Sequence, residues 1–191
     1  RQRPGDLPDE REVICALLSG PRLEQSWQSE AELPDFFEMK GVVEGLLSQL
    51  GVASTFEKCS DESLQLANQA AMGIGGNRLG IVGEVRPEVL ENFEIFEATY
   101  LFEIDLPALL PFTIRHKMFQ PIPRFPSVVR DMALVVDTGI PHQQVLDIIK
   151  SFPLVEQVRL FDVYSGDQVS LCKKCLAYRI TFQSPTHTLT D

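Results

Sequence analysis

The stretch of residues 124–137 constrains the fold most, because a connector that contains several prolines ends there and a short apolar run begins. Proline fixes φ and lacks an amide donor, so Pro121, Pro123 and Pro126 exclude a regular element up to that point. Residues 132–136 are too few for a helix and are typical of a buried strand. The sequence therefore predicts a domain boundary, with a connector over residues 116–127.

The charge balance changes sign at this boundary. Residues 1–114 contain 8 Lys and Arg against 20 Asp and Glu, a net charge of −12, whereas residues 115–191 contain 9 against 7, a net charge of +2. The overall charge of −10 argues against a dedicated nucleic-acid binder, but it averages two unlike halves. We predict an acidic domain over residues 1–115 and a mildly basic one over residues 128–191.

Length and composition exclude several classes of protein. At 191 residues the chain suits one or two domains, and no apolar run approaches the roughly 20 residues that span a bilayer. The first residue is Arg1 and no signal-peptide pattern follows, so we expect a processed chain or a piece of a longer one. Four irregularly spaced cysteines, Cys15, Cys59, Cys172 and Cys175, favour a reducing, cytoplasmic setting.

The first domain is predicted to be α+β with an antiparallel sheet, because strands, hairpins and helices do not alternate strictly. Its clearest helix opens at Asp35, which forms a capping-box pattern with Glu38. The predicted strands cover residues 13–18, 70–74, 78–85 and 98–106, and the predicted helices cover residues 35–50 and 87–92.

The second domain is predicted to have the order β-α-β-β. Its elements are a strand at residues 132–136, a helix at 141–152, and strands at 155–164 and 175–183. The last strand alternates clearly, with Leu176, Tyr178, Ile180 and Phe182 on one side and Cys175, Ala177, Arg179 and Thr181 on the other.

If the apolar side of this strand faces the helix, the other side is an open sheet face. Asp162 and Tyr164 share that face provided that Phe161 and Val163 point inward. Val158 and Leu160 then also share the open face. An aromatic ring, an acid, Arg179 and the small Ala133 could stack and read unpaired bases. The alternative is a purely structural sheet edge.

Two short motifs could suggest other chemistry. Residues 172–175 form a single C-x-x-C, but a zinc site needs further ligands and a redox motif opens a helix, not a strand. Residues 73–80 are glycine-rich, but their spacing is not that of a phosphate loop and a strand follows them. We therefore expect two unpaired cysteines and a hairpin turn, with no metal site.

The second-domain motifs resemble the ferredoxin-fold anticodon-binding domain that ends the beta chain of bacterial phenylalanyl-tRNA synthetase. The first-domain motifs resemble the core module of the same chain, in the same order. The motifs are residues 124–136, 160–164, 174–183 and 188–191 in the second domain, and residues 17–21 with Trp27, 35–44, 80–89 and 102–105 in the first.

The resemblance implies a class II synthetase-like core module without catalytic residues. Phenylalanine activation with ATP and Mg²⁺ then belongs to the alpha chain of an (αβ)2 assembly, and this chain alone is expected to be inactive and to hold no cofactor. The implied partners are the alpha chain and tRNAPhe, with no membrane and no DNA.

The resemblance also implies which residues meet the RNA. Cys175 stands where the family often has serine, so the hydrogen bond that a serine hydroxyl would make to a base is not expected here. The implied anticodon-binding residues are Ala133, Asp162, Tyr164, Cys175 and Arg179, and the phosphate-contact candidates are Lys173 and Lys174.

A ferredoxin-like unit is β-α-β-β-α-β, so the second domain is expected to lack its last helix and strand beyond a helix start at residues 188–191. The apolar face of residues 176–182 is then expected to be unusually exposed. Residues 63–69 lack the family's Pro-Gly turn, so a different loop is expected there. The alternative function is a ferredoxin-like regulatory domain that binds a small molecule or a protein.

Overall fold

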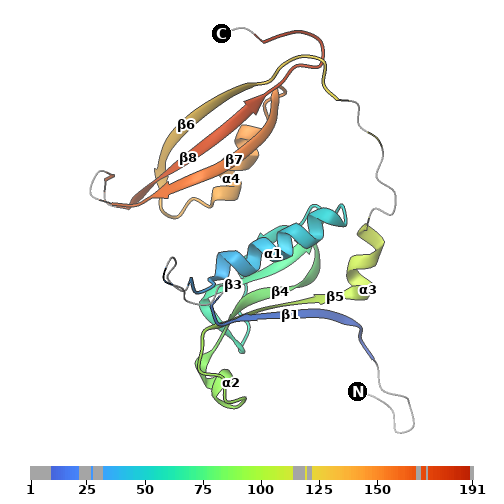
Figure 1. Cartoon of the computed structure of the whole chain (residues 1–191), viewed down its shortest axis with the longest axis vertical. Helices are drawn as coiled ribbons and strands as arrows, with labels where there is room; N and C mark the ends of the chain where they lie inside the picture. The colour runs from blue at the N-terminus through green and yellow to red at the C-terminus, as the bar shows by residue number, and fades with distance from the viewer. Residues whose placement is uncertain are drawn as a thin grey trace. The chain divides into compact units, whose positions relative to one another are not determined.

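The computed structural model describes residues 10–21, 27, 32–113, 119, 122–166, 169–170 and 172–189. The chain forms two compact units, Arg1–Met118 and Phe119–Asp191, and each has its own antiparallel sheet (Figure 1). None of the helices within these described ranges is long and apolar enough to cross a membrane. Residues 116–118, 120 and 121 of the predicted connector lie outside the described residues.

The first unit is a five-stranded antiparallel sheet in the order β1-β5-β4-β3-β2, with α1 packed against one face (Figure 1). This arrangement confirms the α+β prediction for the first domain. Its elements are β1 (Val13–Ser19), α1 (Phe36–Gln49), β2 (Thr55–Glu57), β3 (Leu64–Ile74), β4 (Asn77–Val85), α2 (Pro87–Glu91), β5 (Thr99–Asp105), α3 (Leu106–Leu109) and the 3-10 turn η1 (Leu110–Phe112).

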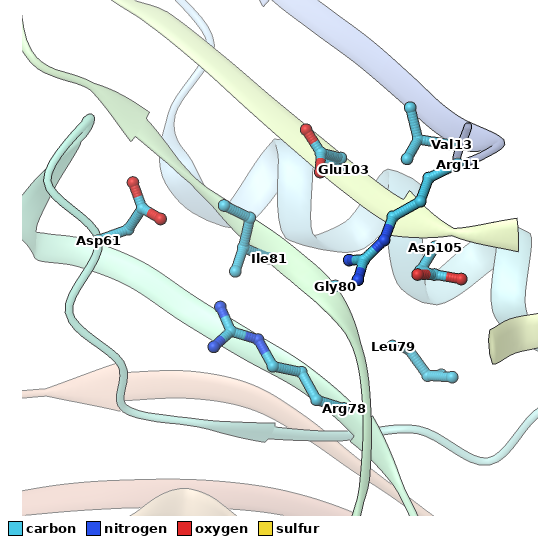
Figure 2. A pocket seen from close by; sticks show the side chains of 9 residues that line it. All are labelled: Arg11, Val13, Asp61, Arg78, Leu79, Gly80, Ile81, Glu103 and Asp105. Carbon is cyan, nitrogen blue, oxygen red and sulfur yellow. The ribbon is translucent and has the colours of Figure 1, made fainter. Parts of the chain in front are cut away.

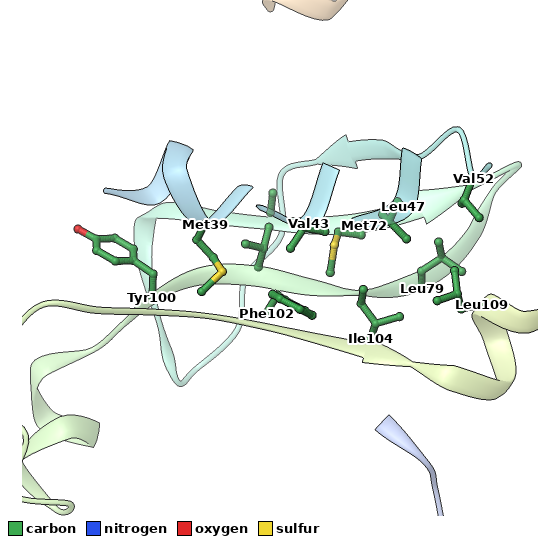
Figure 3. Close-up of a cluster of buried hydrophobic side chains, with 12 residues drawn as sticks. Met39, Val43, Leu47, Val52, Met72, Leu79, Tyr100, Phe102, Ile104 and Leu109 are labelled. Carbon is green, nitrogen blue, oxygen red and sulfur yellow. The ribbon is translucent and has the colours of Figure 1, made fainter. Parts of the chain in front are cut away.

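Helix α1 begins where the capping pattern predicts. The Asp35 carboxylate accepts a hydrogen bond of 2.8 Å from the backbone N–H of Glu38. Met39, Val43 and Leu47 then recur at helical spacing and are buried against the sheet, as Figure 3 shows. The helix therefore fixes the core side of the first sheet.

Strand β3 corrects the expectation for residues 63–69. These residues were expected to form a loop. Instead, β3 starts at Leu64, which pairs with Val85 at the end of β4, so the hairpin extends over both strands. Gly75 and Gly76 form the predicted turn, and both have the positive φ that glycine tolerates. The short elements β2, α3 and η1 were not predicted, because each is too short for a periodic signal.

The second unit has a three-stranded antiparallel sheet in the order β6-β8-β7, and α4 covers one face of it. Val145 and Ile149 of α4 pack on β8. The β-α-β-β prediction is confirmed. The elements are β6 (Val128–Asp137), α4 (His142–Lys150), β7 (Val155–Tyr164) and β8 (Lys173–Phe182).

The expected exposure of the apolar side of β8 is wrong. Leu176, Tyr178 and Ile180 are at most 4% exposed, because β8 is the central strand and α4 lies over it. The Tyr178 hydroxyl is also satisfied, since it lies 3.0 Å from Nδ1 of His142. The helix start expected at residues 188–191 lies partly outside the described residues, and Thr188 is in no regular element.

Candidate nucleic-acid interface

The face of the second sheet that lies away from α4, here called the open face, is built around Ala177 of the central strand. Residues paired across antiparallel strands project to the same face. Ala177 pairs with Ala133 on β6 and with Asp162 on β7, whereas its neighbours Leu176 and Tyr178 are buried against α4. The middle row of the open face is therefore two alanines with a carboxylate at one end.

A second row lies next to the first, towards the start of β8. Cys175 pairs with Val135 on β6 and with Tyr164 on β7. Tyr164 is 41% exposed, so part of the residue is accessible in the row next to the alanines, and its hydroxyl lies close to Gly166. The structure thus brings together Asp162, Tyr164, Cys175 and Ala133 on one face, as the alternation pattern predicted.

A third row lies on the other side of the alanines, where Arg179 pairs with Asp131 on β6 and with Arg159 on β7, and it contains an ion pair. The Asp131 carboxylate accepts two hydrogen bonds from Arg179, of 2.8 Å from Nε and 2.7 Å from Nη2. The guanidinium carbon of Arg179 also lies 5.4 Å from the centroid of the Phe161 ring. Arg179 is therefore on the open face as predicted, but it is held in place by Asp131 and Phe161.

The bidentate hydrogen bond from Arg179, helped by its positive charge, lowers the pKa of the Asp131 carboxyl. A carboxylate with a lowered pKa stabilises the fold above its unfolded-state pKa, and this contribution is lost as pH falls through the folded-state pKa. We expect an NMR titration to find a lower pKa for Asp131 than for the same group in Arg179→Gln. Equal values in the two proteins would contradict the ion pair.

An irregularity in β7 corrects two expectations about this face. The pairing register shifts between Leu160 and Asp162, so Phe161 lies beside Arg179 and not inward as predicted. Val158 and Leu160 pack in the core with α4, whereas they were predicted to share the open face. Val163 pairs with the buried Leu176 and lies on the α4 side, as predicted.

Sequence reasoning did not name Asp131, Phe161 or Arg159 among the residues of the open face. Asp131 is two residues before Ala133 in β6, so the same alternation would have found it. The position of Phe161 could not be predicted, because strict alternation assigns it to the other face and the residue types do not reveal the register shift.

The two lysines between the cysteines lie on different faces. Lys173 pairs with Asp137 at the end of the open face. Lys174 pairs with Val136 on the α4 side, and its Nζ donates a hydrogen bond of 3.1 Å to the carbonyl of Thr138. The structure therefore brings Lys173, but not Lys174, to the open face.

The open face can hold a planar, unpaired ring system. Two alanines leave a shallow floor, and Tyr164 offers a ring on which a base can stack. The Asp162 carboxylate accepts hydrogen bonds and does not donate them, so it selects a base edge that carries donors. Cys175 offers only a weak thiol donor at the position where a serine hydroxyl was considered.

The first unit carries a groove of about 330 Å³ on its sheet (Figure 2). Arg11 and Arg78 line it together with Asp61, Glu103 and Asp105, so cationic and anionic side chains are mixed within it. Within the described ranges, no group of three or more His, Cys, Asp or Glu side chains could hold a metal ion. Arg78 lies on β4 and Arg11 just before β1, and Figure 2 shows both side chains with Asp61, Glu103 and Asp105 around them.

The cysteines form no disulfide in the described chain. Cys15, Cys59, Cys172 and Cys175 are all free thiols. Burial, reinforced by the negative charge of Glu103, raises the pKa of the Cys15 thiol, so this group stays protonated and is a poor nucleophile.

Comparison with known proteins agrees with the geometry of both units. Residues 123–191 match the ferredoxin-fold anticodon binding domain, and residues 1–106 match the phenylalanyl tRNA synthetase beta chain CLM domain. The second unit is thus an anticodon-binding domain of the ferredoxin fold.

Similar whole proteins extend this assignment to the chain. It is 45% identical over 183 residues to the phenylalanine–tRNA ligase beta subunit of Dehalococcoides mccartyi, which covers 96% of this chain. The beta subunits of Symbiobacterium thermophilum and Listeria monocytogenes are 38% and 35% identical, each over 97% of this chain. The chain belongs to the phenylalanyl-tRNA synthetase beta chain family. It spans only 23%, 21% and 24% of the lengths of these three relatives.

Proposed function

We propose that the open face of the second unit binds the anticodon loop of tRNAPhe, as part of the beta chain of a cytoplasmic phenylalanine–tRNA ligase. The alpha chain is the proposed partner, in an (αβ)2 assembly, and ATP- and Mg²⁺-dependent activation of phenylalanine is assigned to it. In this proposal the present chain contributes RNA recognition and assembly, and no catalytic residue.

One observation carries the proposal. The register of β6, β8 and β7 puts Ala133, Ala177 and Asp162 in one row, with Tyr164 in the next row on the same face. These residues come from three strands that are far apart in the sequence, yet they form a floor, a hydrogen-bond acceptor and a stacking ring. Proteins recognise an unpaired base by stacking it on an aromatic or arginine side chain and by hydrogen bonds to its edges, and this face offers a group for each.

The chemistry of Asp162 indicates which base it reads. A carboxylate prefers a base edge with two donors, which guanine offers at N1 and N2. The phenylalanine anticodon begins with guanine, so Asp162 is assigned to that base. Tyr164 stacks on the same base and Ala133 packs under it, while Lys173 meets phosphate and contributes no sequence information.

We expect Asp162→Ala to reduce discrimination at the first anticodon base by about tenfold or more, the range for a hydrogen bond to a charged group. The measurement is kcat/KM of the assembled two-chain enzyme for tRNAPhe and for a transcript with that base changed. Asp147→Ala is the control, because Asp147 is an exposed aspartate on α4, away from the open face. An unaltered ratio between the two transcripts in Asp162→Ala would remove Asp162 as a base reader.

A further inference from the structure

We infer that Phe161 and Arg179 form a second stacking site on the open face, for a second unpaired nucleotide of the same RNA, and that Asp131 positions Arg179 for it. The inference rests on the proposed function and deepens it. It assigns roles to Phe161 and Asp131, which the resemblance did not include among the implied contacts.

The ion pair between Asp131 and Arg179 lies in a different row of the sheet from Tyr164. Tyr164 stands in the row of Cys175, and the ion pair stands in the row of Arg179. These two residues of β8 are four positions apart, on the order of 13 Å at the rise of a strand. Ala177 lies between them, so the face has a shallow floor with one stacking group on each side.

The local structure of β7 explains why Phe161 is available. The register shift after Leu160 turns the phenyl ring out of the α4 core and leaves it 50% exposed. An exposed ring in a sheet gains little from burial, whereas one that lies beside a guanidinium can stack on a base together with it. Its place on the same face as Tyr164 and Asp162 puts the exposed ring where the proposed function places the RNA.

Asp131 decides what kind of contact Arg179 makes. Both of its carboxylate oxygens bind the guanidinium, which fixes the plane of the group and offsets its charge. A neutralised, oriented guanidinium contributes stacking more than phosphate attraction. The contact is therefore expected to depend weakly on salt, unlike that of Lys173, whose charge acts on phosphate.

The test is a double-mutant cycle between the protein and the RNA. The whole 191-residue chain, as wild type and Phe161→Leu, is titrated with anticodon stem-loop RNAs that are intact or abasic at either neighbour of the first anticodon base. We expect Phe161→Leu to weaken binding of the intact loop about fivefold or more. This loss should vanish with one of the two abasic loops, because the partner base is then already missing.

Three further variants make the result specific. Phe161→Tyr keeps the ring and should bind within about twofold of wild type, while Phe152→Leu, an exposed phenylalanine beyond the end of α4, should bind as wild type. Asp131→Asn removes the charge that offsets Arg179, so the slope of log affinity against log salt should steepen by about 0.7.

The outcomes separate this inference from the proposed function. If Tyr164→Ala leaves binding unchanged, the open face is not the anticodon site and the proposed function fails. Suppose instead that Tyr164→Ala weakens binding. If Phe161→Leu then lowers the affinity by the same factor for every loop, or does not lower it at all, only the second stacking site is overturned. Circular dichroism of each variant shows whether a loss of affinity comes from unfolding. If Phe161→Leu unfolds, the results for Phe161→Tyr and Asp131→Asn decide whether the second stacking site exists.

Discussion

Gly80→Ala is expected to destabilise the first unit by about 3 kcal/mol or more, the upper range for inserting an atom into a packed core. A Cβ at this position would lie 1.9 Å from the carbonyl oxygen of Glu103 and 2.9 Å from the Cα of Ile104. Both are backbone atoms of β5, and Gly80 is paired with Ile104. Relief of the clash therefore requires β4 and β5 to separate in the middle of the sheet.

Gly45→Ala is the matched control. Gly45 lies in α1, and a Cβ there meets nothing within 4 Å. Replacing a glycine in a helix with alanine should stabilise the unit by about 0.5–1 kcal/mol. Urea unfolding followed by NMR resolves the two units separately. A Gly80→Ala protein whose first unit unfolds within about 0.5 kcal/mol of wild type would contradict the close approach of the two strands.

Gly80 also illustrates what sequence reasoning could and could not supply. The glycine-rich stretch was predicted to be a hairpin turn and not a phosphate loop, and Gly75 and Gly76 do make that turn. Glycine is required at position 80 for a different reason, because this residue lies inside β4 where the backbone of β5 comes close. Such a reason depends on the partner strand, and no local pattern of residues encodes it.

Elements with a long or strongly periodic signal were predicted well. The capping pair and apolar stripe of α1 and the alternation of β8 are local properties, so they gave both the element and its apolar side, although that side of β8 is more buried than expected. The strand start at Leu64 was missed because residues 64–69 mix polar and apolar side chains without clear alternation. Tertiary pairing with β4, not propensity, makes this segment a strand.

The candidate site was predictable as far as alternation holds. Ala133, Asp162 and Tyr164 were grouped correctly because side chains alternate regularly between the two faces of the sheet around Ala133 and from Asp162 to Tyr164. Phe161 and Leu160 were assigned to the wrong faces because one extra residue in β7 inverts the parity on one side of it. A register shift is a property of the strand pair, so its place could not be found from β7 alone.

Tyr164→Ala is expected to weaken binding of the anticodon stem-loop about 5- to 150-fold, which corresponds to roughly 1–3 kcal/mol for the loss of one stacked base. The ring is 41% exposed and stands beside the alanine floor, so its removal opens the face without emptying the core against α4. Thermal unfolding of the second unit should therefore change little. Tyr164→Phe keeps the ring and loses only the hydroxyl, so it should bind within about threefold of wild type.

Salt separates this stacking contact from a phosphate contact. Stacking carries no counterion release, so Tyr164→Ala should lower log affinity by the same amount at every salt concentration. Lys173→Ala removes one cationic contact, so it should instead reduce the magnitude of the salt slope by about 0.7 and weaken all loop sequences alike. Titrations of both variants at three or more salt concentrations test this directly. If Tyr164→Ala flattens the slope as Lys173→Ala does, the ring acts by placing charge near the RNA and not by stacking. If Tyr164→Ala leaves binding unchanged, the open face is not the anticodon site.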